Sequence, residues 1–353
     1  MTAQNPSPMK QRMERMPTRT AVRYRRLIGV TLVLTFALIM LGAYVRLTDA
    51  GLGCPDWPGC YGTLSPYHAE EHIARAVEVQ GGEHGPVSMG KAWREMIHRY
   101  FAQLLGVLII AIAVIAWRKR EVLRQSPALP VTLIGVVVLQ GVFGMWTVTL
   151  LLKPAIVTGH LIGGLLTLSL LLWLWLRQTP RPRYVDAEPV ANLYTAAVIG
   201  VVLLAAQIFL GGWTSTNYAA LACPDLPTCR GQWWPPMDFA NALHFVRELG
   251  HTRDGELLSQ EALTAIHVMH RLGAVIVALY VGWLGWRARR TEGVQRLGAA
   301  VLAMLVVQWL LGLSNVHFSL PLAVAVLHNG GAALLLGLLV TLTFRSHQAR
   351  AMV

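Results

Sequence analysis

Four histidines stand inside long apolar segments of the sequence, where their side chains could bind a metal. They are His98, His160, His270 and His328. An imidazole in lipid is costly unless it is paired, so a histidine inside the membrane is by default a functional hypothesis. Two histidines on separate helices of a bundle can ligate the iron of a flat macrocycle from both sides. We therefore expect two bis-histidine heme sites, although a hydrogen bond between helices would explain any one histidine.

The pairing follows the order of the chain, with His98 and His160 in the first half and the other two in the second. Zinc fits less well than heme iron, because no third or fourth ligand recurs at matching positions in both halves. Arg99 and Arg271 directly follow the first histidine of each pair. A guanidinium group suits the carboxylates of heme propionates. An arginine that reaches from the interface toward water is an equally good interpretation.

One position near these histidines differs between the halves. Glu95 precedes His98 by three residues, whereas His267 stands at the equivalent place before His270. Residues three apart share a helix face, so Glu95 is expected to project toward the His98 pocket. There a carboxylate could accept a proton or stabilise a developing cation. A solvated Glu near a helix start is the alternative. The difference indicates that one half does chemistry and the other holds a permanent cofactor.

The elements that carry these residues are predicted to be transmembrane helices. Hydrophobic residues make up 54% of the 353 residues and charged residues only 14%, against about 25% charged in soluble domains. Apolar runs of about 20 residues, enough to cross a bilayer, recur eight times. They cover residues 27–47, 97–117, 129–150, 156–176, 193–213, 264–286, 296–314 and 322–344.

The chain is predicted to be an internal duplication. A Cys-Pro-Asp-x-Pro-x-Cys segment occurs at 54–60 and again at 223–229, each time 13 residues after a Leu-Gly pair. The segment from Gln140 to His160 matches the one from Gln308 to His328. We expect an all-α integral membrane protein in which two tandem four-helix bundles are related by pseudo-twofold symmetry. The expected parts are an N-terminal segment (1–26), two bundles (27–180 and 181–345) and a tail (346–353).

Positive charges predict the orientation of the chain. Of the 30 Lys and Arg residues, 20 lie in the N-terminal segment, the turns after the second, fourth and sixth spans, and the tail. Both termini should therefore be cytoplasmic. The four histidines would then lie toward the outer face. The net charge of +12 is placed at the ends of apolar runs, which argues against nucleic acid. A cleaved signal peptide is the competing interpretation of the first span, which we take as a retained helix.

All four cysteines fall in the two long outer loops. The pairs Cys54–Cys60 and Cys223–Cys229 are expected to form disulfides that stiffen these loops, because the compartment outside the cytoplasmic membrane is oxidising. A redox role is the alternative, more open for the first pair than for the second.

Together these residues resemble the heme A synthase family, and specifically its cysteine-containing subgroup. The resemblance spans about residues 25–345 and rests on five segments. They are Gly42-Ala43-Tyr44-Val45-Arg46-Leu47-Thr48-Asp49-Ala50-Gly51-Leu52 with its cysteine pair, Glu95-x-x-His98-Arg99, Thr158-Gly159-His160, His270-Arg271 and Leu327-His328-Asn329.

The resemblance implies an oxidoreductase that converts the C8 methyl group of heme O to the formyl group of heme A for terminal oxidases. His270 and His328 would hold heme B in the second half, and His98 and His160 would receive heme O in the first. Glu95 occupies the position of the family's functionally important acidic residue. A cytoplasmic membrane location follows, with heme O synthase and terminal oxidase assembly as partners, and a homo-oligomer is compatible.

Two other classes of protein remain open at this point. A di-heme carrier of the cytochrome b type would pass electrons without altering either heme, and the difference between Glu95 and His267 argues against it. A transporter or a thiol-oxidising membrane protein would use the duplicated halves or the cysteines. Four histidines at one outer level fit a transporter poorly.

Overall fold

The computed structural model describes residues 18–80, 82, 85–180 and 184–353. In these ranges the chain is helical and has no β-strand, and eight helices are long and apolar enough to cross a membrane. This confirms the predicted fold class. The helices are α2 (Arg19–Leu47), α4 (Met89–Arg118), α6 (Ala128–Thr149), α7 (Pro154–Arg177), α9 (Tyr194–Thr216), α11 (Gln260–Arg290), α12 (Gln295–His317) and α13 (Leu322–Arg350).

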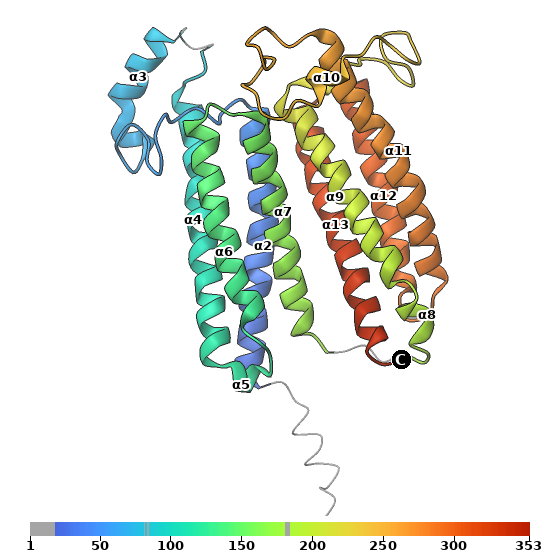
Figure 1. Cartoon of the computed structure of the whole chain (residues 1–353). Coiled ribbons are helices and arrows are strands. Elements are labelled where there is room, and N and C mark those ends of the chain that lie inside the picture. Colours follow the sequence, from blue (N-terminus) through green and yellow to red (C-terminus); the bar gives the residue numbers. More distant parts are fainter. Residues whose placement is uncertain (1–17, 81, 83–84, 181–183) are drawn as a thin grey trace, which may run out of the picture.

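The long helices form two groups of four that stand side by side (Figure 1). In the first group, α2 and α6 each pack against both α4 and α7, so that α4 and α7 occupy opposite corners of the bundle. In the second group, α9 and α12 each pack against both α11 and α13, which are again at opposite corners. Each group is therefore a four-helix bundle with the same order of neighbours.

The contacts between the two groups follow a twofold arrangement. Helix α2 packs against α13, and its counterpart α9 packs against α7, which is the counterpart of α13. The remaining contact, between α7 and α13, joins two equivalent helices. A twofold axis along the helices would produce this set of contacts, as the sequence duplication predicts.

Short helices close the two ends of the molecule. At one end lie the long loops, with α3 (Glu70–Val79) in the first and α10 (Phe239–Ala242) in the second. At the other end lie α5 (Arg120–Leu123), α8 (Glu188–Ala191) and the C-terminus (Figure 1). Helices α4, α7, α11 and α13 all begin at the end that carries the long loops.

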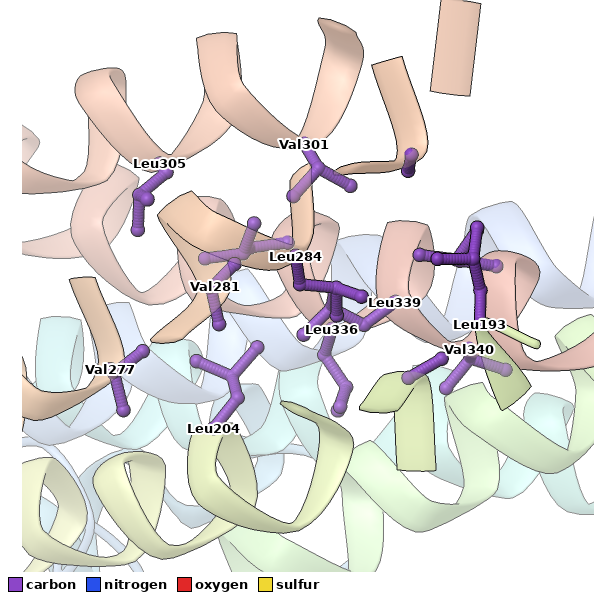
Figure 2. Close-up of a cluster of buried hydrophobic side chains, with 14 of the residues drawn as sticks. Leu193, Leu204, Val277, Val281, Leu284, Val301, Leu305, Leu336, Leu339 and Val340 are labelled. Carbon is purple, nitrogen blue, oxygen red and sulfur yellow. The ribbon is translucent and has the colours of Figure 1, made fainter. Parts of the chain in front are cut away.

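The core of the second bundle is a continuous cluster of branched aliphatic side chains (Figure 2). Leu204, Val281, Leu284, Leu336 and Leu339 from three helices are all buried in it. Because lipid tails are as apolar as leucine, contacts of this kind hold membrane helices together by close packing rather than by removing apolar surface from water. The histidines lie beyond this cluster, toward the end with the long loops.

Helices α4 and α11 begin earlier than their apolar runs predict. Helix α4 starts at Met89 rather than at 97, and α11 at Gln260 rather than at 264. In both, a serine hydroxyl caps the helix: Ser88 accepts a hydrogen bond from the Lys91 amide, and Ser259 accepts one from the Ala262 amide, each at 3.2 Å. Hydropathy misses these polar first turns, whereas an N-cap accounts for them. His98 therefore lies well inside its helix instead of opening it.

The expected ends of the chain also change. Residues 1–17 of the predicted N-terminal segment lie outside the described part, but α2 already begins at Arg19 and Tyr24 is buried in the first bundle. At the other end α13 continues to Arg350, so most of the predicted tail is the last turn of this helix. Polar residues in helix ends hide these turns from a hydropathy profile.

Gly298 tests the close approach between α11 and α12. A Cβ atom at this position would lie 2.2 Å from the backbone nitrogen of Arg289, and backbone cannot swing aside as a flexible side chain can. We expect Gly298→Val to lower the free energy of unfolding by at least the ~1–3 kcal/mol that overpacking typically costs. The measurement is the Tm of the purified protein in detergent. Gly135→Ala, where a Cβ meets nothing within 4 Å, is the control and should leave the Tm nearly unchanged.

Candidate functional site

The four histidines lie on the helices that stand at opposite corners of each bundle. His98 is on α4 and His160 on α7, while His270 is on α11 and His328 on α13. The two imidazoles of each pair are near enough to interact electrostatically. All four lie six to ten residues from a helix start at the loop end, or ~9–15 Å along the axis. The structure thus brings the histidines together as two pairs at one level.

Each imidazole faces a glycine of a neighbouring helix. A Cβ added at Gly42 would lie 3.0 Å from Cε1 of His98, and one at Gly211 would lie 2.9 Å from Cε1 of His270. The same relation holds for Gly144 with His160 at 3.6 Å and for Gly312 with His328 at 3.2 Å. These four glycines occupy equivalent places in α2, α6, α9 and α12, and three of them leave less space than a methyl group ordinarily needs.

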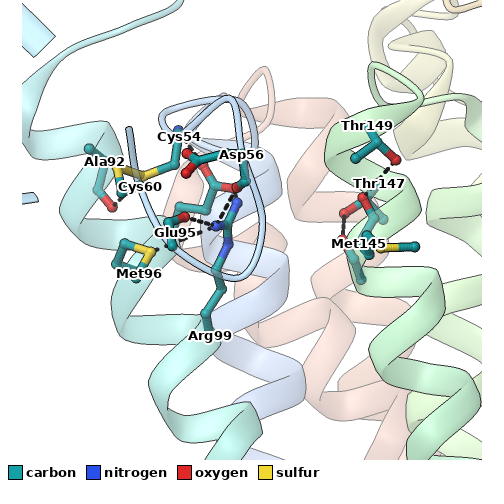
Figure 3. Close-up of polar contacts among 12 residues, drawn as sticks. Cys54, Asp56, Cys60, Ala92, Glu95, Met96, Arg99, Met145, Thr147 and Thr149 are labelled. Carbon is teal, nitrogen blue, oxygen red and sulfur yellow. Dashed lines mark hydrogen bonds and ion pairs between the residues drawn. A yellow bond between two sulfur atoms is a disulfide. The ribbon is translucent and has the colours of Figure 1, made fainter. Parts of the chain in front are cut away.

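Glu95 is buried under the first disulfide loop (Figure 3). One carboxylate oxygen accepts a hydrogen bond from the Cys54 amide at 2.9 Å, and the other pairs with the guanidinium group of Arg99. Arg99 also donates to the carbonyl oxygen of Asp56, at 2.8 Å, and to that of Gly59. The structure rules out a solvated Glu95, because only 4% of the residue is exposed.

The second bundle repeats this arrangement with a different acceptor. Nδ1 of His267 accepts a hydrogen bond from the Cys223 amide at 3.3 Å, and its Nε2 faces Nε of Arg271 at 3.2 Å. Arg271 donates further to the carbonyl oxygens of Thr228 (2.8 Å) and Cys223 (2.6 Å). A neutral imidazole has one acceptor nitrogen and satisfies one of these two donors, whereas the Glu95 carboxylate satisfies both of its donors.

The two disulfide loops share one conformation. Cys54–Cys60 and Cys223–Cys229 are both joined, with Cα atoms 4.8 and 4.6 Å apart. In both loops the second cysteine exchanges backbone hydrogen bonds with the residue three positions later. In both, an aspartate accepts hydrogen bonds from backbone amides across the turn, Asp56 from Tyr61 and Gly62 and Asp225 from Arg230 and Gly231.

Hydrogen bonds also set the ionisation of Asp225 in the second loop. The Thr228 hydroxyl and the Gly231 amide donate to its carboxylate and lower its pKa to about 2. The carboxylate therefore stays ionised at every pH at which the loop is expected to work. These hydrogen bonds favour the folded loop above the usual pKa of an aspartate, and their contribution is lost as the pH falls through about 2.

Arg99 and Arg271, which follow the histidines, bind the two disulfide loops. Arg99 is 8% exposed and binds two loop carbonyl oxygens and Glu95. Half-buried Arg271 binds two loop carbonyl oxygens and faces His267. They hold the disulfide loops over the ends of the bundles. Contact with heme propionates stays a prediction. Across residues 18–80, 82, 85–180 and 184–353, no group of three or more His, Cys, Asp and Glu side chains could hold a metal ion.

Two residues at the site were not assigned a role from the sequence. Gln207 on α9 and Gln308 on α12 approach Nδ1 of His270 and of His328, at 3.0 and 3.3 Å. The repeat contained a signal for them, because Gln140 and Gln308 begin the two matching segments. A glutamine in an apolar helix also needs a polar partner.

Fold and site together define a multi-pass helical membrane protein with two pairs of half-buried histidines beneath two disulfide loops. A family model described as cytochrome oxidase assembly protein matches residues 25–340. The chain is 41% identical to the heme A synthase of Shewanella oneidensis over 90% of its own length and 95% of that protein. It is 29% identical to the heme A synthase of Caulobacter sp. (90% and 94%) and 28% identical to that of Rhizorhabdus wittichii (87% and 89%).

The chain belongs to the heme A synthase family, as the resemblance in its motifs predicts. The match covers both bundles, so all four histidines and both loops fall within it.

The internal duplication supplies its own control for the Arg99 ion pair. Arg99→Leu leaves the Glu95 carboxylate buried without a counter-ion, which typically costs about 3–5 kcal/mol. Arg271→Leu leaves His267, an uncharged imidazole, without its arginine, and should lower the free energy of unfolding by less. We expect a clearly lower Tm for Arg99→Leu than for Arg271→Leu, and partial recovery in Arg99→Leu with Glu95→Gln. Equal Tm values for the two single variants would contradict the assigned charge pairing.

Proposed function

We propose that this protein is a heme A synthase, which oxidises a methyl group of heme O to the formyl group of heme A. The observation that carries the proposal is 41% identity to a heme A synthase over 90% of the chain. The two histidine pairs support it, because a protein that alters one heme and retains another needs two sites.

The second bundle is proposed to hold heme B between His270 and His328. The residues fit such a group: the two imidazoles approach from opposite corners of the bundle, and Gly211 and Gly312 let the rings pack directly against the neighbouring helices. When bound, heme B would supply a one-electron redox centre inside the membrane.

The first bundle is proposed to receive heme O between His98 and His160. Nδ1 of both imidazoles is buried without a hydrogen-bond partner among the residues that the structure describes. Oxidation of a methyl to a formyl group with water as oxygen donor removes four electrons and four protons. A carboxylate close to the reacting carbon can stabilise positive charge and accept a proton.

Glu95 is proposed to be that carboxylate. It lies one turn before His98 on the same face of α4, and its pairing with Arg99 and the Cys54 amide fixes its position. A carboxylate has about four lone-pair sites, so these two donors leave acceptor capacity for a proton from the substrate.

The membrane placement is also a proposal. Arg118, Lys119 and Arg120 lie at the end of the molecule opposite to the disulfide loops, as do Arg287 and Arg289 at the end of α11. By the positive-inside rule this end faces the cytoplasm, together with both termini. The histidines and disulfides then lie toward the outer face of the cytoplasmic membrane. Heme O synthase and terminal oxidase assembly are the proposed partners, and a homo-oligomer is compatible.

Glu95→Gln tests the role of the carboxylate. The amide keeps an acceptor for Cys54 but cannot take up a proton. We expect a bis-histidine heme spectrum like that of the wild type and loss of heme A formation in cells that supply heme O. Extracted pigments identified by chromatography and mass give the readout. Glu71→Gln, the same change on the exposed face of α3, is the control and should preserve heme A formation.

The same extraction separates the alternative of a di-heme electron carrier. Wild-type protein with heme B and heme O or A supports the proposal. Two permanently bound hemes B, with no heme A after coexpression with a heme O source, would establish the carrier instead. Normal heme A output from Glu95→Gln would remove Glu95 from the mechanism.

Gly211 gives a steric test of the proposed heme B site. A Cβ 2.9 Å from Cε1 of His270 must displace the imidazole. We expect Gly211→Ala to lower the ratio of heme B to protein in the purified sample. Gly282→Ala, which places its Cβ at an ordinary 3.7 Å from Leu305 in the same bundle, is the control and should retain heme B.

A further inference from the structure

The four histidine helices and their neighbours contain one repeated pattern with a single exception. Two positions define the pattern. One lies four residues before the glycine that faces the imidazole, on the long helix that precedes the histidine helix. The other lies three residues after the histidine itself. At three sites these residues are glutamine and glycine: Gln140 with Gly163, Gln207 with Gly273 and Gln308 with Gly331. At His98 they are Leu38 and Phe101.

The glycine of each set makes room for the glutamine. A Cβ at Gly273 would lie 2.2 Å from Oε1 of Gln207, and one at Gly331 would lie 2.3 Å from Oε1 of Gln308. No side chain larger than hydrogen fits beside the amide in its present position. The glutamine and the glycine on the facing helix therefore act as one unit.

In the second bundle both glutamines reach their histidines. Nε2 of Gln207 donates to the carbonyl oxygen of His270 at 2.9 Å and lies 3.0 Å from its Nδ1. Nε2 of Gln308 donates to the carbonyl oxygen of His328 at 3.0 Å and lies 3.3 Å from its Nδ1. Each amide thus ties the ring of a histidine to its own main chain.

The first bundle lacks this connection at both histidines. Nδ1 of His98 and of His160 has no hydrogen-bond partner within the described ranges, although Gln140 packs against Gly163. Histidines that bind a metal ordinarily have a partner on the other ring nitrogen, which fixes the tautomer and the ring orientation. The second bundle provides such a partner twice.

We infer that Gln207 and Gln308 are positioning residues that hold the His270 and His328 imidazoles for permanent ligation of heme iron. The inference rests on the proposed function. An amide can serve both tautomers, since Nε2 donates to a bare Nδ1 and Oε1 accepts from Nδ1–H. An imidazole that binds iron through Nε2 carries its proton on Nδ1. Oε1 of each glutamine could accept a hydrogen bond from this Nδ1–H, because it is buried with no partner in the part of the chain that is described. The first bundle, without these contacts, suits a heme that arrives and leaves.

The test uses the full-length protein purified with its hemes. Gln207→Leu recreates the residue found in the first bundle, and Gln308→Leu makes the same change at the other ligand. Loss of an acceptor at Nδ1–H makes the imidazole a weaker donor to ferric iron. We expect a higher midpoint potential of heme B and altered g-values of its low-spin EPR signal in both variants. Loss of heme B from these two variants alone would support the inference equally.

Three further variants keep the test specific. Gln207→Glu retains an acceptor and should keep the potential at or below that of the wild type. Gly273→Ala displaces the amide without removing it and should shift the signal as Gln207→Leu does. Gln140→Leu makes the matched change in the first bundle and should leave heme B unaltered.

The outcomes separate the inference from the proposed function. An unchanged midpoint potential and EPR signal in both leucine variants would overturn the inference and leave the proposed function intact. A loss of heme B from Gln140→Leu equal to that from the two leucine variants of the second bundle would do the same. A wild-type protein without heme B, or a heme B signal that persists in His270→Ala, would instead overturn the proposed placement of heme B.

Discussion

An imidazole inside the membrane is stabilised by a polar partner, and this constraint explains much of the architecture around the four histidines. Water is absent from the hydrocarbon core, so a polar group there is satisfied by protein or by a bound group. Glutamines approach Nδ1 of both histidines in the second bundle, whereas Nδ1 of His98 and of His160 has no partner among the described residues. The structure places His98 opposite His160 and His270 opposite His328 at the diagonal corners of the two bundles. The glycines beside the rings and the loops above them follow from that arrangement.

Duplication gave both bundles one arrangement of helices and of disulfide loops. Both have an arginine that binds the carbonyl oxygens of a disulfide loop, and both have a side chain that accepts the amide of the first cysteine. What differs is the acceptor itself, Glu95 or His267. The cysteine amide and the arginine can both donate to a carboxylate, whereas a neutral imidazole accepts from only one of them.

The sequence predicted the membrane helices and the family, which are confirmed, and the helix contacts repeat in the order that a duplication predicts. These features depend on hydropathy and on repeated motifs, which are local properties of the chain. The starts of α4 and α11 were wrong because their first turns are polar and are fixed by serine caps. The loop contacts of Arg99 and the approach of Gln207 to His270 could not be predicted, because they join segments about 40 and 63 residues apart. The predicted roles of the histidines in heme binding remain proposals.

The exchange of Glu95 for His267 also changes the charge beside each histidine pair. Glu95 with Arg99 and Asp56 carries one more negative charge than neutral His267 with Arg271 and Asp225. At ~10 Å and an effective dielectric constant of about 20, one unit of charge shifts the energy of an electron by about 2 kcal/mol. In the proposed function, oxidation of the methyl group removes electrons from the substrate in the first bundle. The negative charge of Glu95 would assist this removal, and the neutral His267 would leave a heme B held in the second bundle easier to reduce.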